Sequence, residues 1–131
     1  MIVVDANILV YLLIPGPRTA AAQALFEREQ EWAAPILWRS ELRNVLAGCM
    51  RRGELALEEA VALDSEAEDL MSGNEYEMDS RAVLELTQRS RCSAYDCEYV
   101  ALAVQLRTKL VTADEQVLRA FPEVAVPPAI D

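Results

Sequence analysis

The sequence predicts a single α/β domain in which helices cover both faces of a parallel β-sheet. Its length of 131 residues suits one domain, so we expect residues 1–131 to fold as one unit. Short apolar runs alternate along the chain with longer segments of helical periodicity, which is the pattern of a parallel sheet. Hydrophobic residues make up 53% of the chain, which is enough for a substantial core.

The N-terminal half is expected to begin with a buried strand. Residues 2–4 form a β-branched run that ends at Asp5. The next expected elements are helices at 6–13 and 19–31, a strand at 32–36, a helix ending at Gly53 and a helix at 57–71. Apolar residues recur at i, i+3, i+4, i+7 and i+8 from Leu42, which is the core stripe of an amphipathic helix. The inner stripe of the next helix is expected to be Leu57, Ala60, Val61, Ala67, Leu70 and Met71.

The C-terminal half continues the alternation. After Gly73, a natural residue to end a helix, the expected elements are an edge strand at 75–78, helices at 80–91 and 95–106, a strand at 109–112, a helix at 114–120 and a strand at 124–126. The segment 95–106 is apolar over much of its circumference, so we expect a deeply buried helix. Tyr95 and Tyr99 are expected in the core, and the alternative role for both is an exposed aromatic platform for stacking.

The composition excludes several kinds of catalysis. The chain has no histidine, which rules out Ser-His-Asp and Cys-His mechanisms and histidine-ligated zinc. Lys109 is the single lysine, and the phosphate-binding Gly-x-x-x-x-Gly-Lys signature is absent. The three cysteines have no paired short spacing and are expected to be buried free thiols. Chemistry must therefore rest on carboxylates, hydroxyls, arginines or a bound ion.

The net charge of −10 comes from one segment. Of the 22 acidic residues, ten lie within residues 54–79, a stretch without a basic residue, which leaves 12 acids against 12 bases elsewhere. This acidic block is either a solvated helix face or a docking surface for a basic partner. No apolar run approaches the ~20 residues that span a bilayer, and the start lacks a basic signal region. We expect a cytoplasmic protein that does not enter a membrane.

Four carboxylates fall near the edge of the sheet where the strands end. Asp5 follows the first strand, Asp114 lies two residues after the strand at 109–112, Glu41 lies just after the second strand, and Asp96 opens the buried helix. Ligands of open parallel sheets bind at this edge. Taken singly, Asp96 and Asp114 fit helix caps, and Glu41 fits a helix-dipole role.

The four acids together predict a cation site. Closely spaced carboxylates cannot all remain ionised without a cation. Their hard oxygens select Mg²⁺ or Mn²⁺, which can lower the pKa of a bound water and stabilise charge on a phosphodiester.

The sequence resembles the PIN-domain family, and within it the VapC-like toxins of toxin–antitoxin pairs. The four segments that carry the resemblance are Val3-Val4-Asp5-Ala6-Asn7, Ser40-Glu41-Leu42-Arg43-Asn44-Val45-Leu46, Ser93-Ala94-Tyr95-Asp96 with Ala101 and Ala103 beyond, and Leu110-Val111-Thr112-Ala113-Asp114. They occur in family order and span residues 2 to about 126.

The resemblance implies a five-stranded parallel sheet of order 3-2-1-4-5 and an endoribonuclease that depends on Mg²⁺ or Mn²⁺. It assigns metal binding and catalysis to Asp5, Glu41, Asp96 and Asp114. Asn7 and Thr112 would support these acids. Many relatives have a further acid soon after the fourth one. Here Glu115 is followed by Gln116-Val117, so the sequence does not decide whether the site binds one metal ion or two.

The resemblance also implies an RNA substrate, a cognate antitoxin and a homodimer. Candidate phosphate contacts are Arg39, Arg43, Arg51 and Arg52, with Arg81, Arg89 and Arg91 as weaker ones. Solvated helix surface is the alternative role of these arginines. The helices between Arg18 and Met71 are the expected docking surface.

Two other functions compete with the nuclease. One is a PIN-like module that binds RNA or protein without turnover. The other is a haloacid-dehalogenase-type phosphotransferase, which needs a second aspartate where this chain has Asn7 and a lysine after the later strand rather than Lys109 before it. A response-regulator receiver domain is disfavoured as well, because this chain lacks the aspartate that would end the third strand and the partner lysine that such a domain needs.

Overall fold

Five parallel strands form one sheet at the centre of the molecule. The computed structural model describes residues 1–128. The strands are β1 (Ile2–Val4), β2 (Trp32–Pro35), β3 (Glu75–Tyr76), β4 (Leu110–Val111) and β5 (Ala125–Val126), in the order β3-β2-β1-β4-β5. Val3 of β1 pairs with Ala33 of β2 and with Leu110 of β4. The predicted strand order is therefore confirmed.

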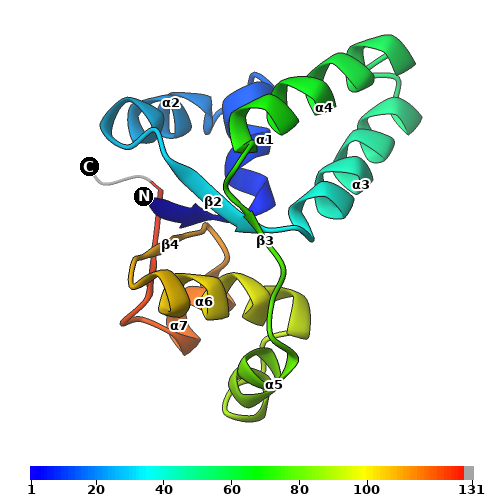
Figure 1. Ribbon diagram of the computed structural model, residues 1–131. Coiled ribbons are helices and arrows are strands. Elements are labelled where there is room, and N and C mark those ends of the chain that lie inside the picture. Colours follow the sequence, from blue (N-terminus) through cyan, green and yellow to red (C-terminus); the bar gives the residue numbers. More distant parts are fainter. Residues whose placement is uncertain (129–131) are drawn as a thin grey trace.

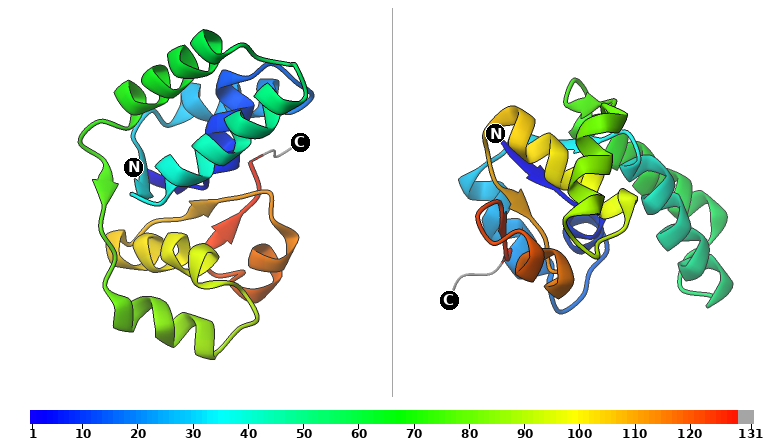
Figure 2. Two further views of the ribbon diagram at one scale, coloured as in Figure 1. Left: turned by 90° about the vertical axis from the view of Figure 1, so that its right-hand side faces the viewer. Right: turned by 90° about the horizontal axis from the view of Figure 1, so that it is seen from below.

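Helices cover both faces of this sheet (Figures 1 and 2). The helices are α1 (Ala6–Leu13), α2 (Thr19–Arg28), α3 (Trp38–Arg51), α4 (Leu57–Met71), α5 (Ser80–Gln88), α6 (Ala94–Leu106) and α7 (Glu115–Ala120). Helices α1 to α4 lie on one side of the sheet and α5 to α7 on the other. This division follows from the strand order, because the chain moves outward from β1 in one direction and returns to build β4 and β5 in the other.

Side chains of the expected types begin four of the helices. Asp5, Asp79 and Asp114 accept hydrogen bonds from backbone N–H groups at the starts of α1, α5 and α7. Ser93 does the same for α6. Because Asp5 and Asp114 each terminate a strand segment and cap the next helix, the chain turns sharply at both carboxylates.

Two helices end earlier than predicted. Helix α2 stops at Arg28 rather than residue 31 because Glu29 is extended and its carbonyl accepts the indole N–H of Trp32 at 2.7 Å. Helix α5 stops at Gln88 rather than residue 91, and the Ser90 hydroxyl donates to the Leu86 carbonyl there at 2.8 Å. At both places, a hydrogen bond from a side chain to a backbone carbonyl marks the end of the helical backbone hydrogen bonds.

The core lies between the sheet and helices α1, α3 and α6. Its fully enclosed residues include Val3, Val4, Ile8, Leu9, Trp32, Trp38, Val100 and Leu102. As predicted, α6 is mostly buried, from Cys97 to Ala103 apart from the half-buried Glu98. The three cysteines are free and buried, also as predicted.

The predicted inner stripe of α4 is partly wrong. Ala60, Ala67 and Met71 are buried, but Leu57 is 62% exposed and Val61 is 49% exposed. The α3–α4 hairpin extends away from the sheet, so its far end has no layer to pack against (Figures 1 and 2). The periodicity of apolar residues identified the helix, but which of these residues are buried depends on the neighbouring elements.

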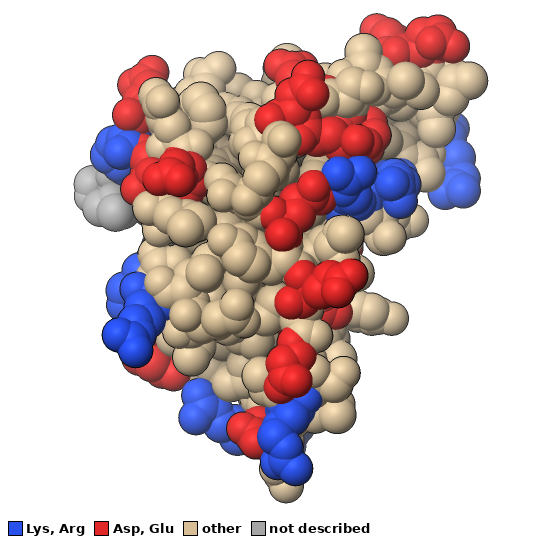
Figure 3. Space-filling view, viewed as in Figure 1, with Lys and Arg blue, Asp and Glu red and all other residues tan. Residues whose placement is uncertain are grey.

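An ionic network fastens this hairpin to the sheet edge. The Arg39 guanidinium donates to both carboxylate oxygens of Glu75, at 2.6 and 2.8 Å, and lies 3.1 Å from Glu68. The indole N–H of Trp38 donates to Glu75 at 2.8 Å. These contacts join α3, α4 and β3, and they pair two acids of the block at residues 54–79, whose members gather on the face shown in Figure 3.

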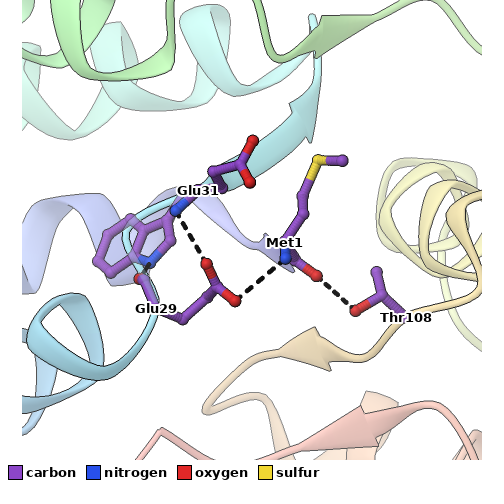
Figure 4. Close-up of polar contacts among 5 residues, drawn as sticks. Met1, Glu29, Glu31 and Thr108 are labelled. Atoms are coloured by element: carbon purple, nitrogen blue, oxygen red, sulfur yellow. Dashed lines mark hydrogen bonds and ion pairs between the residues drawn. The ribbon is translucent and has the colours of Figure 1, made fainter.

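The opposite end of β1 is held by a second polar cluster (Figure 4). The α-amino group of Met1 donates to Glu29 at 3.0 Å, and the Thr108 hydroxyl donates to the Met1 carbonyl at 2.7 Å. Glu29 also accepts from the backbone N–H of Glu31 at 3.1 Å. The starts of β1, β2 and β4 are thus tied together. None of the helices within residues 1–128 is long and apolar enough to cross a membrane.

Candidate active site

A cavity of ≈ 470 Å³ opens at the edge where β1 ends, and three of the four predicted acids line it. Its lining residues are Asp5, Ala6, Asn7, Leu37, Ser40, Glu41, Asn44, Val45, Tyr95, Asp96 and Tyr99. They come from the start of α1, the first half of α3 and the first half of α6. The sheet therefore brings together residues that lie up to 94 positions apart in the chain, Asp5 and Tyr99.

Asp5 lies deepest among the acids. One oxygen accepts from the Ile8 backbone N–H at 3.2 Å, and the other accepts from the Thr112 hydroxyl. Burial raises the pKa of Asp5 to about 6, against the opposing effect of these hydrogen bonds, and the negative charge of Glu41 adds to the rise. Because the site destabilises the ionised carboxylate of Asp5, it favours the binding of a cation that would offset this charge.

Glu41 reaches the cavity from the first turn of α3. Its Oε1 accepts a hydrogen bond of 2.5 Å from the Tyr99 hydroxyl of α6. Burial raises the pKa of Glu41, and the charges of Asp96 and Glu98 raise it further. Tyr99 is 3% exposed, so its predicted place in the core is confirmed, but its hydroxyl faces the site.

Asp96 and Asp114 complete the set from the other side of the sheet. Asp96 stands in the first turn of α6, where burial and the charge of Asp114 raise its pKa. Asp114 is exposed and does not line the cavity. Its backbone N–H donates to the Thr112 hydroxyl oxygen at 3.1 Å, and the same hydroxyl donates to Asp5. Thr112 therefore connects Asp114 to the site.

The donor set suits a hard divalent cation. The raised pKa values of three carboxylates come from burial and mutual repulsion, and no arginine or lysine lines the cavity to offset them. Carboxylate, amide and hydroxyl oxygens are the ligands of Mg²⁺ and Mn²⁺. Within residues 1–128, however, no three acidic or cysteine side chains stand close enough to form a ready-made metal site. The acids would have to move together around an ion.

The predicted arginine contacts divide into two groups. Arg39 is engaged by Glu75 and Glu68, and Arg52 pairs with Glu54 at 2.7 Å. Arg43 and Arg51 are exposed on α3, the helix that carries Glu41. The exposed pair is therefore better placed to meet a phosphate without breaking an existing ion pair.

The sequence analysis missed the roles of the two tyrosines of α6. Tyr95 is 62% exposed at the cavity, so its predicted place in the core is wrong. Tyr99 follows Asp96 by three residues, a spacing that places both on one helix face and could have indicated that they share a site. Ser40 and Asn44 were also missed as lining residues, although they flank Glu41 at one and three residues.

Comparisons with known proteins identify the family of this chain. Residues 2–125 match the PIN domain family. The chain is 30% identical over 129 residues to Ribonuclease VapC3 of Pyrobaculum aerophilum, covering 96% of this chain and 98% of that protein.

Solved structures share the same fold. The crystal structure of FitAcB from Neisseria gonorrhoeae superposes with a TM-score of 0.76 at 19% identity, covering 98% of both chains. A toxin–antitoxin complex from Klebsiella pneumoniae gives a TM-score of 0.71 at 20% identity, again over 98% of both chains.

Proposed function

The chain belongs to the PIN-domain family, and from this premise we propose that it is a metal-dependent endoribonuclease, the toxin of a VapC-like toxin–antitoxin pair. The identity of 30% to a named VapC ribonuclease, over nearly the full length of both proteins, supports the activity. The observation that carries the metal dependence is the cavity at the end of β1, where Asp5, Glu41 and Asp96 have raised pKa values and no basic neighbour in the lining.

Asp5, Glu41, Asp96 and Asp114 would hold one or two Mg²⁺ or Mn²⁺ ions. When bound, such an ion lowers the pKa of a coordinated water and stabilises charge on the phosphodiester. Thr112 favours the ionised form of Asp5 by donating to it, against the effect of burial, and its oxygen accepts from the Asp114 backbone N–H. Asn7 lines the cavity as a further polar support. Arg43 and Arg51 are the proposed phosphate contacts, because they are exposed on the helix that carries Glu41.

The partners proposed are a cognate antitoxin and a second copy of the chain. The whole chain would act as one domain, in keeping with a family match from residue 2 to 125. The α3–α4 hairpin is the proposed docking surface, since it combines the exposed apolar Met50, Leu57 and Val61 with acids of the block at residues 54–79. A partner with apolar and basic residues would complement it.

The phosphotransferase alternative loses its remaining support in the structure. Lys109 precedes β4, and its amine donates to the Glu123 carbonyl at 2.7 Å. That position is at the opposite end of the strand from the carboxylates. The turnover-free binding module remains the competing proposal, and metal-dependent cleavage decides between them.

The test is cleavage of RNA by purified protein with Mg²⁺ or Mn²⁺, with EDTA, and with an Asp96→Asn variant. We expect no cleavage in EDTA and a loss of about 100-fold or more in the variant, because it removes a proposed metal ligand. Asp79→Asn, which alters an exposed helix cap outside the cavity, is the matched control and should retain activity. Cleavage that survives EDTA would refute the proposed mechanism.

A further inference from the structure

The hydrogen bond between Tyr99 and Glu41 joins two helices across the cavity. The donor lies on α6 and the acceptor on α3, 58 residues away in the chain, and their oxygens are 2.5 Å apart. Building on the proposed function, we propose that Tyr99 is a positioning residue that fixes the carboxylate of Glu41 for cation binding.

The geometry limits which oxygen of Glu41 can serve a cation. The Tyr99 hydroxyl occupies Oε1, whereas no protein group within residues 1–128 donates to Oε2. A phenol can donate one proton, and that proton is given to Glu41. Tyr99 therefore holds Glu41 in one orientation with one oxygen free.

Glu41 needs such a restraint more than Asp5 does. Its carboxylate stands at the end of a flexible side chain that has no other hydrogen-bond donor in the described residues. Asp5, by comparison, is held by the Ile8 backbone and by Thr112. The two arrangements are similar: a buried hydroxyl donates to each carboxylate, from Thr112 after β4 to Asp5 and from Tyr99 of α6 to Glu41.

The ring of Tyr99 is fixed by the core, so its hydroxyl is a rigid donor. The residue is 3% exposed, and its neighbours Val100 and Leu102 are fully enclosed. Removing the hydroxyl alone should leave this packing intact. Partners that orient metal ligands typically contribute 10–100-fold in metal affinity or activity, and this is the effect expected here.

The experiment measures Mn²⁺ binding by calorimetry on RNA-free full-length protein, so the readout does not depend on cleavage. Tyr99→Phe should bind Mn²⁺ about 10–100-fold more weakly than the wild type while retaining its melting temperature in EDTA. Tyr11→Phe is the matched control, because it removes a hydroxyl that accepts from Arg18 outside the cavity, and it should bind Mn²⁺ like the wild type.

A double-mutant cycle tests whether Tyr99 acts through Glu41. In a Glu41→Ala background, Tyr99→Phe should cause no further loss of Mn²⁺ affinity. Equal losses in both backgrounds, or wild-type affinity in Tyr99→Phe, would overturn the inference while leaving the nuclease intact. A wild-type protein that neither binds Mn²⁺ nor cleaves RNA would overturn the proposed function itself, and the inference with it.

Discussion

At the scale of single residues, the main feature of the site is the buried carboxylate of Asp5, whose ionised form is destabilised by its surroundings. Asp5 has a pKa of about 6 because burial outweighs its hydrogen bonds from Thr112 and Ile8. The unfolded chain should titrate near the ordinary value of about 3.8. The folded state therefore binds the proton more tightly, and stability is lost as the pH rises from about 4 through 6.

Asp5→Asn should consequently raise the stability of the metal-free protein at pH 7. Asparagine carries no charge and keeps one acceptor oxygen for the Ile8 N–H, while its amide nitrogen can donate to the Thr112 hydroxyl oxygen in place of the bond that Asp5 accepts. The gain should be at most about 3 kcal/mol, from two pKa units at about 1.4 kcal/mol each. Urea unfolding in EDTA at pH 7 and pH 4 measures it, and the gain should vanish at the lower pH. An unchanged or lower stability at pH 7 would contradict the buried-charge interpretation.

Tyr95 presents an aromatic surface next to Asp96. Its side chain is 62% exposed at the cavity, and we expect it to stack on an unpaired base of a bound RNA. Tyr95→Ala in the Asp96→Asn background should weaken binding of a single-stranded oligonucleotide by about 5–150-fold, since base stacking contributes ~1–3 kcal/mol per base. Tyr95→Phe should bind normally. Fluorescence anisotropy measures both, and Val104→Ala, exposed on the same helix, is the control. Normal binding by Tyr95→Ala would exclude stacking.

At the scale of elements, the α3–α4 hairpin depends on its ionic fastening. Arg39 contacts both Glu75 of β3 and Glu68 of α4. Arg39→Met should lower the melting temperature, because Glu75 is only 18% exposed and would lose its charged partner. Arg81→Met, which breaks a pair that is 84% and 62% exposed, should leave it unchanged. Equal melting temperatures for the two variants would show that the network does not hold the hairpin.

The elements were predictable where one side of a helix faces the core and the other faces water. Helices α1 and α4 have the predicted ends, and the stripe from Leu42 identified α3. Helix α6 is enclosed on most sides, so its apolar pattern alone did not separate the residues that face the cavity from those in the core, and only the three-residue spacing of Asp96 and Tyr99 indicated a shared face. That is why Tyr95 and the hydroxyl of Tyr99 were misjudged, while Asp5, at the end of a strand, was placed correctly. Leu57 and Val61 were wrongly predicted to be buried, because burial depends on which elements pack against a helix in the folded protein.

At the scale of the whole molecule, the net charge of −10 opposes compaction and the cavity concentrates part of it. A divalent cation bound only by the folded state should therefore raise the melting temperature. At 100 times its dissociation constant the expected gain is about 2.7 kcal/mol. Differential scanning fluorimetry with MnCl₂ measures it, against KCl of equal ionic strength to account for general screening. A rise of equal size in Asp96→Asn would assign the effect to sites elsewhere on the surface.

The sheet edges have a consequence for assembly. The edge strand β3 has two residues and is followed by Glu77 and Asp79, and the other edge strand, β5, runs directly into Pro127 and Pro128. Charged residues and prolines on edge strands oppose the addition of another strand, because prolines lack the N–H that pairing requires. Copies of this protein should therefore resist fibril growth through open strands, and any ordered oligomer would have to be built from helix faces.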